Sequence, residues 1–266
     1  MTKQSNINIL NPTKIDMKDK KILLELEKNA RQSISQIAKK VRLSKETTNY
    51  RIKRMEKEGL IAGYFTVLNS AALGYNIYRV LIKFQNTTPK KEDEIINYIK
   101  KFHYPLNARL CSIEGEWDLY ASFRAKSIFE FKRFYDAFVY KYGKYIETKN
   151  VNVTTRIYHF LHNLLFDLDD RSHFIFEEET PIIKIDQIDE KIIALLMKDC
   201  RIPTINIAHK LNLSANTVKH RIKRLIKEKV LACFKMKIND APFGYQHYLI
   251  MLTFQNIDHE KKKNLV

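Results

Sequence analysis

The chain has 266 residues, enough for two domains or several small ones, and its 45% hydrophobic and 11% aromatic content excludes a wholly disordered protein. Its 47 lysines and arginines against 30 acidic residues give a net charge of +17, which favours a polyanionic partner, nucleic acid before an anionic membrane. A merely Lys-rich composition is the alternative, and the placement of the charges has to decide between the two.

Several classes of site have no motif here. The six glycines form neither a P-loop nor a GxGxxG fingerprint, HExxH and GxSxG are absent, and the three cysteines make no CxxC pair. We therefore expect no enzyme, with no catalytic residues, no metal and no cofactor. No run of residues resembles a signal peptide or a membrane span, so a cytoplasmic, DNA-associated protein is expected.

An internal repeat dominates the sequence. Residues 15 to 86 align without a gap with residues 185 to 256, an offset of 170 (185 minus 15). The identical pairs include Asp16 with Asp186, Arg31 with Arg201, Ser44 with Ser214 and Arg51 to Arg54 with Arg221 to Arg224. The chain therefore carries two copies of one small unit.

The start of each copy predicts two helices. In the first copy, Ile22 and Leu26 recur at helical spacing, which predicts an amphipathic helix from about residue 16 to residue 28. Ser33 stands three residues before Gln36, the signature of a capping box, and predicts a short helix that continues through Val41.

A third, basic helix is expected after a tight turn. Ser44 is a good N-cap for a helix that runs to about Lys57, and Ser214 has the same place in the second copy. One face of this helix is apolar and is assigned to the core, whereas the other carries mostly positive charge, which favours nucleic acid over a merely solvated surface. The candidate DNA-binding residues are Ser44, Lys45, Glu46, Asn49, Tyr50, Lys53, Arg54, Lys57, Ser214, Asn216, Lys219, His220, Lys223, Arg224 and Lys227.

These helix faces also suggest how bases are read. Asn216 is the best candidate for a bidentate contact with adenine, and Lys53 or Arg54 for a contact with guanine. Glu46 and Tyr50 of the first copy are replaced by Asn216 and His220 in the second. The two copies are therefore expected to prefer different half-sites, and the operator to be non-palindromic.

The segments LIAGYFTVLN and VLACFKMKIN follow the third helix of each copy. Both indicate short strands around a turn, which predicts a β-hairpin wing in each copy. Three helices and a wing make a winged helix-turn-helix, whose third helix fits the major groove of DNA.

With these parts in register, the chain resembles the Lrp/AsnC, or feast/famine, family of transcription regulators. The motifs are IDMKDKKILLELEKNARQSISQIAKKVRLSKETTNYRIKRMEKEGLIAGY and, from Ile185, IDQIDEKIIALLMKDCRIPTINIAHKLNLSANTVKHRIKRLIKEKVLACF. The resemblance implies DNA binding as dimers, often assembled further, through a C-terminal ferredoxin-like βαββαβ (RAM-type) domain. That domain also senses small molecules, commonly amino acids.

The middle of the chain fits such a domain on its own pattern. Strands are expected at 78–85, 108–113, 118–124 and 146–158, and helices at 90–103 and 127–142. The aromatic stripe of the second helix is assigned to the core. Gly115, Trp117 and Asp118 are similar to a glycine, aromatic, Asp turn of the family, so the resemblance implies effector binding there.

The expected fold is therefore α+β, with a winged helix-turn-helix, a ferredoxin-like sensor domain and a second winged helix-turn-helix. The expected divisions are an N-terminal tail at 1–14, the first reader at 15–70, the sensor and assembly domain at 71–160, an acidic linker at 161–184, the second reader at 185–240 and the start of a second, truncated RAM-like domain at 241–266. The acidity of the linker could keep it off DNA or pack it against a basic surface, and a solvated tether is the favoured interpretation.

Two details depart from the family pattern. The family favours a glycine before the wing, as at Gly59, but the second copy has Lys229, so its helix exit is expected to differ. A strand is expected from Tyr248 to Phe254, as the beginning of a second sensor domain.

The predicted function is sequence-specific binding of double-stranded DNA and regulation of transcription, with an amino acid or similar effector and homo-oligomerisation through the ferredoxin-like domain. Two alternatives stay open. Some proteins with this layout decarboxylate siroheme-type tetrapyrroles, and an effector-independent architectural DNA-binding protein would share the basic helices.

Overall fold

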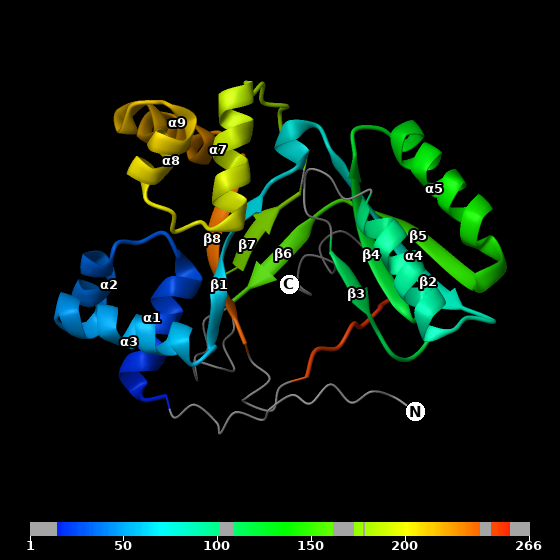
Figure 1. Ribbon diagram of the computed structural model, residues 1–266, viewed down its shortest axis with the longest axis horizontal. Helices are drawn as coiled ribbons and strands as arrows, with labels where there is room; N and C mark the ends of the chain where they lie inside the picture. Colours follow the sequence, from blue (N-terminus) through cyan, green and yellow to red (C-terminus); the bar gives the residue numbers. More distant parts are fainter. Residues whose placement is uncertain (1–14, 102–108, 162–172, 178, 240–245, 256–266) are drawn as a thin grey trace.

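The computed structural model describes residues 15–101, 109–161, 173–177, 179–239 and 246–255 (Figure 1). The expected tail at 1–14, part of the expected linker at 162–172 and the last residues, 256–266, lie outside these ranges. The two groups of helices from the repeat lie on one side of the molecule, and the ferredoxin-like sheet lies on the other.

The helices of the first copy form where local signals place them. They are α1 (Met17–Lys28), α2 (Ile34–Val41) and α3 (Lys45–Lys57). Asp16 and Asp19 form a capping box at α1, and Ser33 and Gln36 form the predicted one at α2. The apolar stripes of the three helices meet in one core, and its members include Ile22, Leu26, Ile37, Ile52 and Met55.

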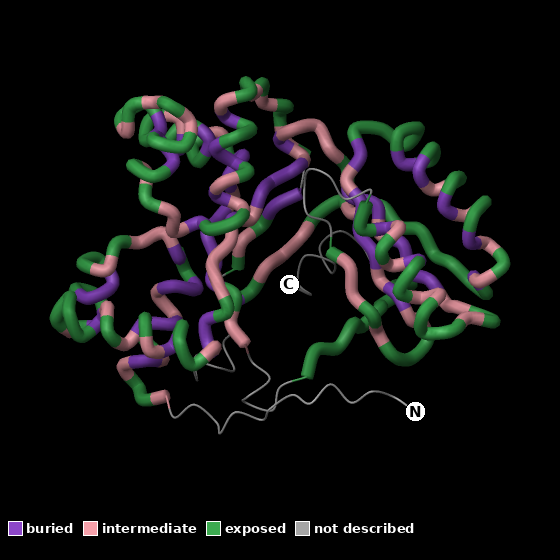
Figure 2. Tube along the Cα trace, in the orientation of Figure 1, coloured by how far each residue is buried: buried purple, intermediate pink, exposed green. Residues whose placement is uncertain are grey.

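The second copy repeats this arrangement with α7 (Gln187–Lys198), α8 (Thr204–Leu211) and α9 (Ala215–Lys227). One cap is lost, because Pro203 stands at the start of α8 and offers no side-chain acceptor. Figure 2 shows buried segments on the inward faces of both helix groups and along the strands between them.

The expectation that the helix exit of the second copy differs was wrong. Gly59 has φ 73° and Lys229 has φ 57°, so both adopt the left-handed conformation. The next residue makes the same backbone bond in each copy, from Leu60 N to Met55 O at 3.0 Å and from Val230 N to Leu225 O at 2.9 Å. Lys229 therefore adopts a backbone conformation that is favourable for glycine and costly for other residues.

The predicted hairpin wings were also wrong. Each copy has one continuous strand, β1 (Ile61–Leu68) or β8 (Leu231–Ile238), and these two strands pair antiparallel with each other. Neither segment contains the residues of a tight two-residue turn, so the chain stays extended. The free edge of each strand is covered by the strand of the other copy, so β1 and β8 form one shared two-stranded sheet.

The register of this sheet makes a pseudo-two-fold axis. Phe65 faces Lys235, and these are equivalent positions of the repeat (65 plus 170 is 235). The ladder is irregular at Ala62 on one strand and at Ala232 on the other, which are again equivalent (62 plus 170 is 232). The two copies therefore join as a symmetric dimer would, within one chain (Figure 1).

Polar contacts across the junction follow the same symmetry. Arg31 donates to the carbonyls of Cys200 and Ile202, and Arg201 donates to the carbonyls of Ala30 and Gln32. The cores interlock as well, because Ala30 and Leu68 of the first copy belong to the buried cluster of the second. The pair of copies is thus one packed body.

The middle domain is ferredoxin-like, as predicted. Its strands are β2 (Asn76–Phe84), β3 (Leu110–Ser112), β4 (Leu119–Ala125) and β5 (Ile146–Thr154), in the sheet order β3-β4-β2-β5. The helices α4 (Pro89–Lys101) and α5 (Ile128–Tyr142) pack on one face of this sheet. The aromatic stripe of α5 is buried there, and Phe131 stacks on Tyr78 with ring centroids 4.4 Å apart.

The segment after this sheet is not simply a solvated linker. The strand β6 (Ile157–Phe160) pairs antiparallel with β7 (His173–Phe176), which lies inside the range expected to be a tether. Glu177 follows at 4% exposure and accepts bonds from the backbone N–H groups of Ser70 and Ala71 at 2.9 and 3.0 Å. The acidic charge of this residue is therefore used inside the fold, which composition alone could not show.

The strand expected from Tyr248 to Phe254 is not formed. Residues 246–255 are exposed and contain no strand. A strand needs a hydrogen-bonded neighbour, and β2, the equivalent segment of the first copy, has β4 and β5 beside it. No described residue takes those places next to 246–255.

Candidate nucleic-acid interface

The positions of α3 and α9 are set by their first residues and by a buried stripe. Ser44 accepts a bond from the N–H of Thr47 at 3.0 Å, and Ser214 accepts the same bond from Thr217 at 3.0 Å. One side of each helix is buried in its own copy, through Thr48, Ile52 and Met55 or Val218, Ile222 and Leu225. The opposite side of each helix therefore faces solvent.

The first arginine of each helix is an internal clamp. The Arg51 guanidinium contacts Asp16 at 2.7 Å and the buried Asp19 at 2.9 Å, which ties α3 to the start of α1. Arg221 makes the same contacts with Asp186 and Asp189, at 2.7 and 2.9 Å. Because a buried carboxylate is costly to leave unpaired, these arginines serve the fold first.

Arg54 and Arg224, both predicted to contact DNA, are held in the same way. Arg54 lies 2.6 Å from Asp19, and its Nε is 3.8 Å from Glu58. Arg224 pairs with Asp189, and its Nε lies 3.7 Å from Glu228. Of the two residues expected to read guanine, Lys53 is therefore the more available.

The remaining predicted residues lie on the solvent side of the helices. Asn49 is half-buried, Tyr50 is 67% exposed, and the others are exposed, namely Ser44, Lys45, Glu46, Lys53, Lys57, Ser214, Asn216, Lys219, His220, Lys223 and Lys227. Within the described ranges, no carboxylate pairs with the lysines of either helix face. The lysines of each helix face are therefore available to an anionic partner, and α3 also carries the exposed Glu46.

The carboxylates at the N-caps of α1 and α7 have lowered pKa values. The pKa of Asp16 is lowered because the backbone N–H of Asp19 donates to it at 2.8 Å, and Arg51 adds to the effect. The pKa of Asp186 is lowered by the N–H of Asp189 and by Arg221. The ionised carboxylates are the form that pairs with Arg51 and Arg221 and so holds α3 and α9 in place.

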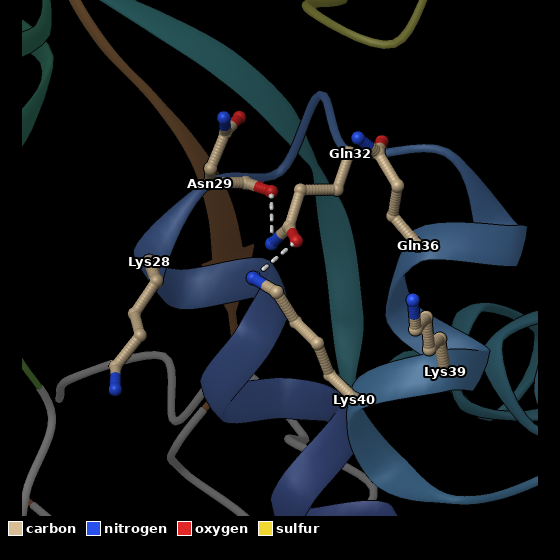
Figure 3. Close-up of a pocket in the computed structure, with 6 residues that line it drawn as sticks. All are labelled: Lys28, Asn29, Gln32, Gln36, Lys39 and Lys40. Carbon is tan, nitrogen blue, oxygen red and sulfur yellow. Dashed lines mark hydrogen bonds between the residues drawn. The ribbon is translucent and has the colours of Figure 1, made fainter.

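A surface pocket of about 660 Å³ lies between α1 and α2 of the first copy, and sequence reasoning did not identify it (Figure 3). Lys40 points to Gln32 and bonds its side-chain oxygen at 2.7 Å, and it also pairs with Glu25 at 2.6 Å. The lining residues are Lys28, Asn29, Gln32, Gln36, Lys39 and Lys40. The second copy has Ile202 where the first has Gln32, so the partner of Lys40 in this lining is not repeated, although the other equivalent positions are polar.

The turn predicted to bind an effector is tightly bonded. Asp118 accepts bonds from Lys83 Nζ and from the N–H of Phe84, both at 2.8 Å, and Lys83 also donates to the carbonyl of Gly115 at 3.0 Å. The carboxylate is therefore used within the domain. Trp117 has a buried indole N–H that meets no acceptor in the described part of the chain.

The comparisons with known proteins agree with this geometry. A family model described as winged helix-turn-helix DNA-binding matches residues 15–62 and 185–231. The chain is 38% identical over 90 residues to the HTH-type transcriptional regulator LrpA of Pyrococcus horikoshii, a match that covers 34% of this chain and 62% of that regulator. It is 32% identical over 123 residues to the HTH-type transcriptional regulator FL11 of Pyrococcus furiosus, covering 46% of this chain and 78% of that one.

A solved structure resembles the chain over a greater length. The crystal structure of the siroheme decarboxylase NirDL superimposes with a TM-score of 0.57 at 13% identity, and covers 84% of this chain and 65% of that one. At this identity the likeness concerns the fold alone.

The described ranges contain no membrane-spanning helix and no metal-binding cluster. None of the helices there has the length and apolar character needed to span a bilayer. No group of three or more His, Cys, Asp and Glu side chains in that part of the chain is placed to hold a metal ion.

Two winged helix-turn-helix matches, and relatives matched over most of their length, show that the chain belongs to the Lrp/AsnC family of transcriptional regulators.

Proposed function

We propose that this protein regulates transcription by binding one stretch of double-stranded DNA with two unlike recognition helices. The observation that carries the proposal is the pairing of β1 with β8, which joins two winged helix-turn-helix copies about a pseudo-two-fold axis. Dimeric DNA-binding proteins of this type use the same relationship to address two half-sites. Here one chain supplies both readers.

The lysines of the two helices supply the phosphate contacts. Three are exposed on α3 (Lys45, Lys53 and Lys57) and three on α9 (Lys219, Lys223 and Lys227). If all six neutralise phosphates, the logarithm of affinity falls against the logarithm of salt concentration with a slope of about −5. The face of α9 has no acidic residue, whereas α3 carries Glu46 and Glu56, so α9 binds the backbone more strongly.

The positions that differ between the helices supply specificity. Asn216 offers an amide that can donate to and accept from adenine, whereas Glu46 at the equivalent position can only accept, as from the amino group of cytosine. Tyr50 and His220, a second equivalent pair, present a phenol in one copy and an imidazole in the other, which differ in shape and in the position of their polar atoms. The favoured operator is therefore two different half-sites in a fixed order.

The sheet domain has two further proposed roles. By family, it assembles chains into oligomers and holds a small effector such as an amino acid. The buried indole N–H of Trp117 lies beside the Gly115 turn. It could donate a hydrogen bond to a carboxylate or carbonyl oxygen of an effector. A thermal shift with a panel of amino acids tests this part, and an unchanged melting temperature throughout would contradict it.

Selection of binding sites from random DNA, followed by footprinting on genomic DNA, tests the main proposal. The expected result is discrete protected sites built from two dissimilar half-sites. A perfect palindrome would contradict the two-preference reading, and uniform coverage would favour an architectural protein. Absorption spectra of the same preparation with and without added haem test the tetrapyrrole alternative, which a tight coloured complex together with absent DNA binding would favour.

A further inference from the structure

The described chain is packed as two separate bodies (Figure 1). One is the sheet domain, β2–β5 with α4 and α5, and the other is the reader pair, the two winged-helix copies joined through β1 and β8. The buried core of the sheet domain draws its residues from Tyr78 to Ile146, and neither copy contributes to it. The cores of the reader pair contain no residue of the sheet domain. No shared apolar core therefore joins the two bodies.

A buried polar cluster lies where the two bodies meet. Glu177, directly after β7, is 4% exposed, and Ser70, after β1, is 0% exposed. The Glu177 carboxylate accepts bonds from the N–H groups of Ser70 and Ala71 at 2.9 and 3.0 Å, and from the Ser70 hydroxyl at 2.6 Å. Arg124 of β4 donates from Nε to the same hydroxyl at 3.0 Å, and its Nη2 lies 4.0 Å from the carboxylate. The cluster therefore links a strand of the sheet domain to the end of the first copy's strand.

The second copy is tied to the same place. The N–H of Glu177 donates to the side-chain oxygen of Asn69 at 3.2 Å, and the N–H of Asn69 donates to the carbonyl of Val230 at 3.0 Å. Ile183, shortly before α7, donates its N–H to the carbonyl of Ala72 at 2.8 Å. Glu177 thus lies at the meeting point of the first copy, the second copy and the sheet domain.

This arrangement has a local cost. Glu177 has φ 58°, a left-handed conformation that is unfavourable for a residue with a side chain. A buried carboxylate is also costly unless it is paired, and here the N–H groups, the hydroxyl and Arg124 surround it. Burial lowers the pKa of Arg124, and the Glu177 carboxylate acts against this shift. The strained, buried acid is therefore held by groups from both bodies.

We propose that Glu177 and Arg124, connected through the Ser70 hydroxyl, form a latch that fixes the angle between the sheet domain and the reader pair. With the latch closed, the two bodies move as one. With the latch open, the sheet domain turns about the segment from Ser70 to Gly74, where β1 leads into β2 and Gly74 has φ 77°. Both charged residues are positioning residues, and the inference does not depend on DNA binding.

Spin labels in the full chain report this angle. Pulsed electron paramagnetic resonance measures the distance between a label at A137C on α5 and a label at K210C on α8, both at exposed positions. A second label pair, K39C on α2 with K210C, lies wholly within the reader pair and shows whether that body is intact. The half-buried Cys111 is replaced by serine in every sample.

The two remaining cysteines do not interfere with labelling. Cys200 and Cys233 are buried, and burial raises their pKa values to about 12 and about 11. Their thiols therefore stay protonated and closed from the label at neutral pH.

The test opens the latch from each side. We expect R124M and E177Q each to broaden the 137–210 distance distribution by about twofold or more, because the bodies then turn against each other, and to leave the 39–210 distribution unchanged. R124K keeps the charge next to Glu177 and should stay closer to the native width than R124M, which a role in filling space alone would not produce. E179Q removes an exposed carboxylate two residues away and is the matched control, with the native width expected.

The native 137–210 width in folded R124M and E177Q would overturn the proposal. If E177Q does not fold, as the 39–210 pair would reveal, R124M decides alone. That variant leaves the bonds from Glu177 to the backbone of Ser70 and Ala71 in place, and removes only the donor from the sheet-domain side. A native width in R124M would then show that the two bodies are held together without the latch.

Discussion

Arg31 and Arg201 are equivalent residues, and each bonds the two backbone carbonyls that flank the other. Arg31 reaches the carbonyls on either side of Arg201, with the Ile202 oxygen at 3.1 Å, and Arg201 reaches those on either side of Arg31, with the Gln32 oxygen at 3.4 Å. The carbonyls belong to the loops after α1 and α7. These loops therefore depend on each other for their hydrogen bonds.

Removing either arginine should weaken the junction. Because a hydrogen bond to a charged group contributes about 1.5–3 kcal/mol, we expect Arg31→Ala or Arg201→Ala to lower the free energy of unfolding by about that amount. Urea denaturation followed by circular dichroism measures it. Arg31→Lys is the control, since it keeps the charge but loses the planar fork, and it should retain only part of the stability. If the free energy of unfolding of both alanine variants equals that of the native protein within error, these arginines do not stabilise the junction.

Replacing Lys229 by glycine should stabilise the protein. Lys229 holds φ 57°, which costs a non-glycine residue about 1–2 kcal/mol, whereas glycine adds about 0.5–1 kcal/mol of unfolded-chain entropy. The expected gain for Lys229→Gly is therefore about 0.5–1 kcal/mol. Lys229→Ala, which removes the charge but keeps the strained backbone, should gain nothing, and Gly59→Ala should lose stability. Thermal unfolding of the three variants decides.

Asn216→Ala should relax base preference in one half-site only. Loss of a bidentate contact costs about 1–3 kcal/mol of discrimination at one base position. Competition binding with a set of operators mutated base by base measures the effect. Glu46→Ala is the matched control on the other helix and should relax the opposite half-site. If both variants affect the same half-site, the two-reader arrangement fails.

Lys223→Ala should weaken binding to all DNA sequences alike. The loss of one phosphate contact reduces the magnitude of the salt slope by about 0.9. Arg221→Ala, two residues earlier, should instead reduce protein stability, since its partners are Asp186 and Asp189. Affinity measured across a salt series, together with unfolding curves, separates the two roles. An unchanged slope for Lys223→Ala would place that lysine away from DNA.

Acid should loosen both recognition helices. The pKa values of Asp16 and Asp186 are lowered on folding, so the folded state binds fewer protons than the unfolded state near pH 4. The stability contributed by these groups is present above their ordinary pKa of 3.8 and is lost as the pH falls below it. Asp16→Asn combined with Asp186→Asn should flatten the dependence of stability on pH between about 5 and 3. An unchanged slope in the double variant would assign acid sensitivity to other carboxylates.

The helices could be predicted because their signals are local. Ser33 with Gln36 forms the predicted capping box, and Ser44 caps α3 through a residue three positions away. The partner of β1 could not be predicted in this way, since the pairing of Phe65 with Lys235 joins residues far apart in the chain. Alternating apolar residues show that a strand forms, and they do not show which edge covers it.

The candidate site was predictable as a surface and less so residue by residue. The basic faces of α3 and α9 are exposed as expected, but Arg54 and Arg224 turn toward Asp19 and Asp189. The two copies have the same arginine and the same aspartate at these equivalent positions, so aligning them does not reveal the pairing. A helical projection cannot decide whether an arginine at the margin of a face contacts DNA or a carboxylate of the neighbouring helix. Burial of Glu177 was missed for a related reason, because its partners at Ser70 and Ala71 are remote in sequence.

The shared β1–β8 sheet also determines how the protein responds to dilution. A reader assembled from two separate subunits loses one of them when its concentration falls below the dissociation constant of the dimer. In the proposed binding mode the chain itself holds the second helix close to the first, so binding of one helix places the other near its half-site without a second chain. Occupancy of a single operator should therefore rise with the first power of protein concentration, and a substitution in one helix can change one half of the operator while the other half keeps its reader.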